Sequence, residues 1–361
     1  MATHFFHSGM VGAPTNTNAA GSTLAIIRAV LSTGFNLLTP QTATVAGGVM
    51  TLTYSAPHGY EDKVLLRLDG APGGSVVRRV TASAGSSSLT IPAPGFADGA
   101  VSGGLSTRVA PAGWEEVFTG AGVGVFRSTV IGPGSTRFFY RVVDTAAGAS
   151  AAEFRGFESM TDVDTGIGPF PTAAQQDGGQ GISFYRSDLS TPRPWCAIAD
   201  GRTLYLILAY FNSAIGTGRA FGDMTPYASS DAFCAFTIGG SDIYSYLADS
   251  SKPHYVPRIA AGTGLAQTGT RRALFSPSGT THSYPSPIDG GLMLSRPILV
   301  SESGAIRGEM RGMMACSANP ISGSLFAIMP TVSGFSGRVC VVSDGNGSGQ
   351  AVAFPIDEDW P

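Results

Sequence analysis

Apolar and polar residues alternate in short segments along the first half of the chain. Each segment is bounded by Gly, Ser, Pro or another turn-forming residue; they cover residues 48–56, 63–68, 75–84, 87–93, 123–131, 136–144 and 151–158. Alternation with a period of two is typical of β-strands that bury one face, and the intervening residues favour turns. We therefore expect antiparallel strands rather than alternating strands and helices.

The second half continues with strand-like runs that are more apolar. They cover residues 182–187, 203–211, 232–238, 291–300, 323–329, 337–344 and 350–356. Between the halves, residues 161–181 are crowded with Gly, Pro and polar residues, as in a linker. The pattern predicts a mainly β fold with two sandwich-like or barrel-like domains, residues 1–165 and 166–361. In the second domain, residues 249–288 predict a long loop suited to recognition.

One segment has a helical period. In residues 21–36, GSTLAIIRAVLSTGFN, the side chains of Leu24, Ile27, Val30 and Leu31 fall on one face of a helix. Ser22 or Thr23 can cap its start and Gly34 can end it. We expect this short N-terminal helix to pack on the first β unit or on a neighbouring subunit.

Charged residues make up 13 % of the chain, where about 25 % is usual, and 49 of the 361 residues are glycine. A surface so poor in charge is either unusually rich in neutral polar groups or largely covered by neighbouring proteins, such as copies of the same subunit. The net charge of -3 and the pI near 5.9 predict neither nucleic acid nor an anionic membrane as partner. The apolar run 24–31 is short and contains Arg28, so neither a signal peptide nor membrane insertion is expected.

Four cysteines are far apart in apolar surroundings, and none forms a CxxC pair: Cys196, Cys234, Cys316 and Cys340. We expect buried free thiols rather than a zinc site or a redox motif. Reduced thiols suit folding in a reducing cytoplasm.

The stretch APHGYEDKVLLRL, residues 56–68, places titratable groups ahead of an alternating run. His58 and Tyr60 are candidates for proton transfer, but Pro57 and Gly59 favour a structural turn. Glu61 and Asp62 are adjacent, so in a strand they would point to opposite faces and could not act as a pair. We interpret them as solvated residues at the start of a strand.

Two stretches place oxygen atoms on alternate residues, as calcium loops do. They are DVDTGIG, residues 162–168, and DGNGSG, residues 344–349. The oxygens belong to Asp162, Asp164, Asp344, Asn346 and Ser348. In the second stretch the position of the bidentate Glu of an EF-hand is occupied by Pro355, so a hairpin turn is the simpler interpretation.

The sequence contains no GxSxG, HExxH, phosphate loop or dinucleotide-binding fingerprint. Four histidines lie in segments without a local signature: His4, His7, His254 and His282. Asp223 and Glu309 are the first carboxylates to consider for glycoside hydrolysis, with turn and surface roles as the alternative. Four aromatic residues are expected in the core, with a binding face as the alternative: Trp195, Tyr205, Tyr210 and Phe221. No catalytic, cofactor-binding or metal-binding residue is predicted.

Several stretches together resemble structural proteins of tailed bacteriophages. Residues 21–36, which end a short helix in Gly-Phe, precede a small β module with a His-Gly turn in residues 45–93. Residues 114–171 and 289–313 are also similar to segments of such virion proteins. Related modules often have Asn-Gly where this chain has PGGS, residues 72–75, and a small residue with Pro-Gly where it has MRGMM, residues 310–314.

The resemblance implies a virion protein with no catalytic residues to carry over. The expected function is a structural component of a phage tail, at the tail tip or baseplate, in several symmetric copies. Residues 1–165 would anchor it to other virion proteins, and residues 166–361 would project loops toward a receptor on the host surface. The alternatives are a head decoration or head-fibre protein, and a tail-associated polysaccharide hydrolase.

Overall fold

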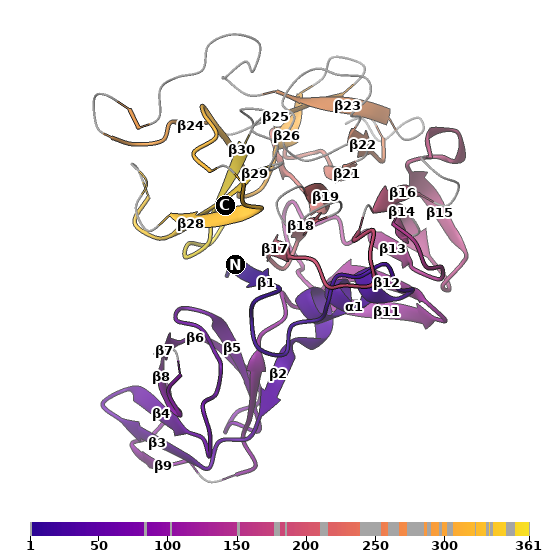
Figure 1. Cartoon of the computed structure of the whole chain (residues 1–361). Helices are drawn as coiled ribbons and strands as arrows, with labels where there is room; N and C mark the ends of the chain where they lie inside the picture. Colours follow the sequence, from indigo (N-terminus) through magenta and orange to yellow (C-terminus); the bar gives the residue numbers. More distant parts are fainter. Residues whose placement is uncertain are drawn as a thin grey trace.

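The computed structural model describes residues 2–82, 85–101, 103–149, 152–176, 181–184, 186–209, 216–238, 254–258, 267–272, 285–286, 290–295, 298–301, 306–321, 323–329, 332, 335–343 and 351–360. These residues form five antiparallel sheets and one short α-helix (Figure 1). The predicted mainly β fold with a short N-terminal helix is therefore confirmed. No helix within these ranges has the length and apolar character needed to cross a membrane.

Residues 35–109 form a separate lobe, which we call the module (Figure 1). It contains two sheets. The first has the order β2 (Phe35–Leu38), β10 (Ser106–Val109), β5 (Leu65–Asp69) and β6 (Val76–Arg79). The second has the order β7 (Thr81–Ala82), β8 (Ser88–Pro92), β4 (Val49–Thr53), β3 (Thr42–Ala46) and β9 (Gly99–Ala100).

The predicted alternation accounts for how the module packs. In β4, Met50 and Leu52 are buried while Val49 and Thr51 are exposed. Leu66 and Leu68 of β5 are buried in the same core cluster. Each sheet thus buries one apolar face, which gives the two-sheet arrangement of a small β-sandwich.

The remaining described residues, which we call the body, contain three further sheets. One is built of β11 (Trp114–Gly120), β12 (Val123–Ser128), β13 (Phe139–Val143), β14 (Ala152–Met160) and β15 (Gly166–Phe170), with β16 (Ile182–Phe184) also paired to β14. A 3₁₀ turn, Ala173–Gln175, follows β15.

The largest sheet has ten strands in the order β1 (His4–His7), β17 (Trp195–Ala199), β18 (Thr203–Ala209), β19 (Gly216–Asp223), β21 (Ala235–Ile238), β22 (His254–Val256), β23 (Gln267–Arg272), β25 (Ile298–Ser301), β26 (Ile306–Glu309) and β20 (Thr225–Pro226). The last sheet has the order β24 (Leu294–Ser295), β27 (Met314–Cys316), β30 (Ala351–Pro355), β29 (Val339–Ser343) and β28 (Phe326–Met329).

The ten-stranded sheet is the middle layer of the body, because β17 and β18 are buried on both faces. On one face the Phe221 ring stacks on Tyr140 of β13, with 4.6 Å between ring centroids. On the other face the Tyr205 ring lies 4.8 Å from that of Phe354 in β30. Trp195, Tyr205 and Phe221 are thus core residues, as predicted, whereas Tyr210 lies outside the described residues.

The predicted helix is present as α1 (Ser22–Arg28) and continues as a π-helical turn, η1 (Ala29–Thr33). Gly34 ends it with φ +69°, as expected. The predicted cap by Ser22 or Thr23 is wrong, because the carboxylate of Asp144 accepts the backbone N–H groups at the helix start. Within the chain, the helix packs against β11 and β17 through η1.

The predicted domain boundary between residues 165 and 166 falls between two strands that pair with each other, β14 and β15. In addition, the N-terminal strand β1 pairs with β17 of the second half. The lobe that stands apart is the module, which begins after the stop at Gly34 and ends before β11. The predicted boundary rested on the Gly-rich composition after β14. That segment is a turn between two paired strands and does not separate two domains.

Candidate functional site

His58 and Tyr60 lie in the loop between β4 and β5. Gly59 has φ +68°, and a Cβ at that position would lie 2.7 Å from Cγ2 of Val11, so the turn requires glycine. The Nδ1 atom of His58 accepts the Tyr60 backbone N–H at 2.9 Å, and the two rings stack. The prediction of a structural turn at His58 is confirmed.

The Tyr60 hydroxyl belongs to a buried group that joins three parts of the module. It donates to the Asn36 carbonyl at 2.8 Å and lies 2.9 Å from Oγ1 of Thr107, which is also 3.0 Å from the Tyr54 hydroxyl. Burial raises the pKa of Tyr54 to about 12 and raises the pKa of Tyr60 as well, although hydrogen bonding to Thr107 opposes both shifts. Both phenols therefore stay neutral and act as hydrogen-bonding links.

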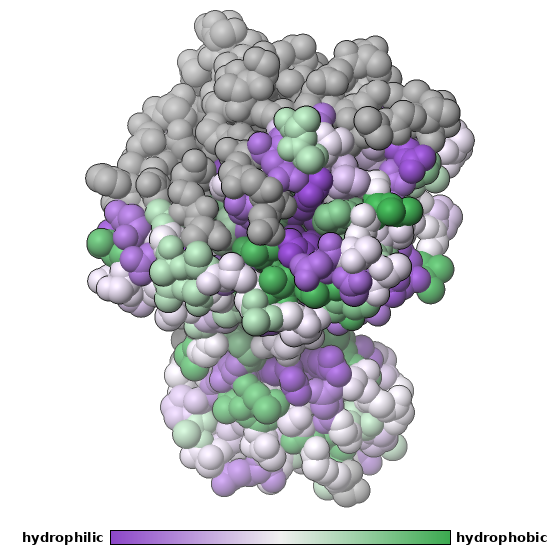
Figure 2. Space-filling view, turned by 90° about the vertical axis from the view of Figure 1, so that its right-hand side faces the viewer, coloured by the Kyte–Doolittle hydropathy of each residue, from purple (hydrophilic) through white to green (hydrophobic). Residues whose placement is uncertain are grey.

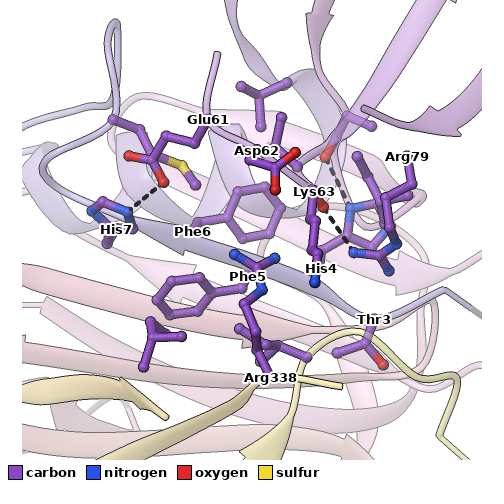
Figure 3. A pocket seen from close by; sticks show the side chains of 17 residues that line it. Thr3, His4, Phe5, Phe6, His7, Glu61, Asp62, Lys63, Arg79 and Arg338 are labelled. Atoms are coloured by element: carbon purple, nitrogen blue, oxygen red, sulfur yellow. Dashed lines mark hydrogen bonds and ion pairs between the residues drawn. The ribbon is translucent and has the colours of Figure 1, made fainter. Parts of the chain in front are cut away.

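Glu61 and Asp62 are exposed residues of a turn ahead of β5, which begins only at Leu65. Their interpretation as residues leading into a strand is confirmed. Because neither residue lies in a strand, the opposite-face argument does not apply to them, and both line one small cleft. Figure 3 shows this junction cleft, which lies between the module and β1 of the body.

Two histidines of β1 contact the module and the segment that follows it in the chain. The Nε2 atom of His7 lies 3.0 Å from the Glu61 carboxylate (Figure 3). The Nδ1 atom of His4 lies 3.0 Å from the carbonyl of Ala110, in the segment that connects β10 to β11. The pKa of His4 is lowered to about 4, chiefly by burial and also by the neighbouring Arg79 charge, while the hydrogen bond to Ala110 opposes the shift. His4 is therefore neutral and donates to that carbonyl at pH 7.

On the other side of the cleft, three cations surround Asp357, next to the C-terminal end of β30. Arg338 lies 3.0 Å, Arg79 3.5 Å and Lys63 3.6 Å from the carboxylate. Burial by itself would raise the pKa of Asp357, but the hydrogen bonds and charge of Arg338 and the charge of Lys63 lower it below its usual value. Because Lys63 and Arg79 belong to the module, Asp357 ties the module to the body.

The junction cleft has a volume of about 60 Å³. That space holds a few water molecules, whereas pockets for small-molecule ligands are commonly about 300–1,000 Å³. The contact between His7 and Glu61 and the ion pairs of Lys63 and Arg79, which line the cleft, with Asp357 already link the body to the module. The arrangement holds the module against the body.

The two carboxylates considered for hydrolysis have separate partners. Asp223 is buried; its carboxylate accepts from Oγ1 of Thr136 at 2.6 Å and from Nε of Arg202 at 3.1 Å. Burial raises the pKa of Asp223, and these hydrogen bonds oppose the rise. Glu309 instead accepts from the Tyr227 hydroxyl at 2.9 Å and lines a second cleft of about 210 Å³ beside Trp360.

The first candidate calcium loop is the turn between β14 and β15. The Asp162 carboxylate accepts the backbone N–H groups of Asp164 and Thr165, and Asp164 forms an ion pair with Arg141. Among the described residues, no group of three or more His, Cys, Asp or Glu is arranged to hold a metal ion.

Some predictions concern residues that the structure does not describe. The second candidate loop, residues 344–349, and His282 are among them. Most of residues 249–288 are also not described, but the prediction of one long loop there is wrong, because β22 and β23 lie within this range and pair with each other. His254 is described and lies buried in β22.

All four cysteines are free and buried, as predicted. Burial raises the pKa of each thiol, which keeps it protonated and unreactive in the folded protein.

Sequence reasoning missed the buried arginine–aspartate pairs of the body. They are Arg186–Asp144, Arg307–Asp231, Arg311–Asp200 and Arg202–Asp223, and all eight side chains are at least nine-tenths buried. The available signal was a single charge next to an apolar run, such as Asp200 at the end of RPWCAIAD. The residues next to each arginine in the sequence do not indicate which aspartate it pairs with.

Comparison with known proteins adds no family assignment. No family model matches the chain, and no curated protein matches it.

Proposed function

We propose that the chain is a non-catalytic structural subunit of a tailed-phage particle, located at the tail tip or baseplate. The observation that carries this proposal is the junction cleft. There, residues that could have formed a reactive group instead tie a separate β module to a larger body.

The resemblance to phage virion proteins supports the same function. Residues 21–36 and 45–93, which carry much of it, fold as the N-terminal helix and most of the module. The module is joined to the body by two chain crossings and by the ion pairs of Asp357. In the proposed particle, the module attaches the subunit to its neighbours and the body carries the surface directed toward the host.

Immunogold labelling of purified particles tests the location. An antibody against residues 170–361 is expected to label the tail tip, with particles lacking the gene as the control. Label over the head would contradict a tail location and would indicate a head decoration or head-fibre protein. Absence of the chain from purified particles, confirmed by mass spectrometry, would overturn the structural proposal.

A hydrolase is separated from a structural subunit by a second experiment. Asp223→Asn and Glu309→Gln particles are expected to be as active on host-surface polysaccharide as unmodified particles. Loss of depolymerisation in either variant, with normal particle assembly, would refute a non-catalytic function.

A further inference from the structure

Two of the module's five basic residues lie next to each other on the outward face of its first sheet. Arg108 of β10 lies directly opposite Arg67 of β5, and Arg67 lies opposite Val77 of β6. These side chains share one face because Leu66, Leu68 and Thr107, at the alternate positions, are buried. We call this surface the arginine face: Leu37, Arg67, Val77 and Arg108. Arg79 lies farther along β6 and pairs with Asp357 of the body, so it is not part of this surface.

Two like charges facing each other across neighbouring strands are unfavourable. Asp69 compensates for part of this cost, since its carboxylate lies 2.7 Å from Nε of Arg67 and 3.1 Å from Nη2 of Arg108. One carboxylate between two guanidinium groups leaves an excess of positive charge. The same face exposes two apolar side chains, with Leu37 60 % and Val77 40 % accessible. An apolar face with excess positive charge fits a protein surface that offers carboxylates beside an apolar side chain.

The hairpin between β14 and β15 offers that chemistry. Its turn exposes Asp162 and Asp164, and the Asp164 side chain is 70 % accessible although it pairs with Arg141. Ile167 of β15 is 68 % accessible on the same hairpin. We call Asp162, Asp164 and Ile167 the acidic hairpin. β15 pairs only with β14 among the described strands, so its other side is a sheet edge.

The net charges of the module and of the rest of the chain also have opposite signs. The module has five basic and four acidic residues, out of 22 and 25 in the whole chain, so the rest of the chain has 17 basic and 21 acidic residues. A module and the body of another copy therefore attract each other electrostatically. Figure 1 places the module at the lower left of the molecule and β15 at the right-hand side of the body. Figure 2, which views the side on which β15 lies, shows hydrophobic and hydrophilic residues beside each other on that side.

We propose that the arginine face of one copy binds the acidic hairpin of the next copy. Because the two surfaces differ, the contact is head-to-tail, and such contacts close into rings when the rotation between copies permits it. This inference deepens the proposed function, on which it rests, by naming the surfaces through which copies of the subunit associate.

The test uses the full-length chain and exposed positions that are not needed for folding. Val77→Glu places a carboxylate opposite Arg67 and against the acidic hairpin of the next copy. Ile167→Lys places a cation against the arginine face. Each single variant is expected to raise the dissociation constant for self-association at least about tenfold, because like charges are brought together at the contact. The double variant restores opposite charges and is expected to return to within about threefold of the unmodified chain.

Analytical ultracentrifugation over a concentration series provides the measurement, and circular dichroism checks that every variant is folded. Ile131→Lys, at a position 82 % accessible and outside both surfaces, is the matched control and is expected to associate like the unmodified chain. A chain that stays monomeric at about 100 µM would overturn the proposal. If the single variants associate like the unmodified chain, or if the double variant associates as weakly as either single variant, the assignment of these two surfaces is wrong. The labelling of particles tests the proposed function separately.

Discussion

His4 makes the stability of the fold depend on pH in a way that can be worked out from the structure. The side chain is 7 % exposed, its ring stacks on Phe6, and its Nδ1 atom bonds to the Ala110 carbonyl. Its pKa falls from 6.5 to about 4 in the folded protein. Burial is the largest cause and Arg79 adds to it, while the Ala110 carbonyl and the charge of Asp200 oppose it.

The direction follows from proton binding. As the pH falls below 6.5, the imidazole of the unfolded chain takes up a proton, whereas the folded protein resists protonation until about pH 4. The contribution of His4 is therefore complete above pH 6.5 and is lost as the pH falls toward 4. At about 1.4 kcal/mol per pH unit, the loss over this interval is about 3 kcal/mol.

The substitution His4→Asn isolates this contribution. An asparagine amide can donate to the Ala110 carbonyl but does not titrate, and the lost stacking on Phe6 is a constant offset. Urea unfolding of both proteins, followed by tryptophan fluorescence between about pH 7 and pH 4, gives the difference in unfolding free energy at each pH. The unmodified protein is expected to lose about 3 kcal/mol relative to the variant across this range. A difference that stays constant within about 0.5 kcal/mol would refute the neutral, buried assignment of His4.

Three other predictions address the core and the turns. Arg186→Met leaves the buried Asp144 carboxylate without its cation and is expected to lower the free energy of unfolding by about 3–5 kcal/mol in urea titrations; a loss below about 1 kcal/mol would contradict this. Gly59→Ala is expected to lower the melting temperature more than Gly47→Ala, because both glycines have positive φ but only at Gly59 does a Cβ collide with Val11; equal losses would show that the collision is relieved at no cost. The four thiols are expected to stay unreactive toward a disulfide reagent at about pH 8 until urea unfolds the chain, and reaction of any thiol in the native protein would contradict its burial.

The sequence by itself determined the fold class and several strands, such as β4 and β5, whereas β17, β22 and β23 are not among the predicted segments. Met50 and Leu52 alternate with exposed neighbours in β4, and the alternation follows from the geometry of an extended chain, in which successive side chains point to opposite faces. Gly59 and Gly34 could likewise be assigned to a turn and to a helix end, because φ preferences act locally. The fold class and the turn at His58 were thus open to prediction.

Only the tertiary structure decided which distant residues meet. Asp144 caps a helix that begins more than 120 residues earlier and also pairs with Arg186, although nothing next to Asp144 in the chain indicates either contact. The junction cleft likewise forms because β1 joins the ten-stranded sheet and Asp357 reaches Lys63 of the module. Sheet order brings these side chains together, and sheet order depends on the burial of the whole core rather than on any local pattern.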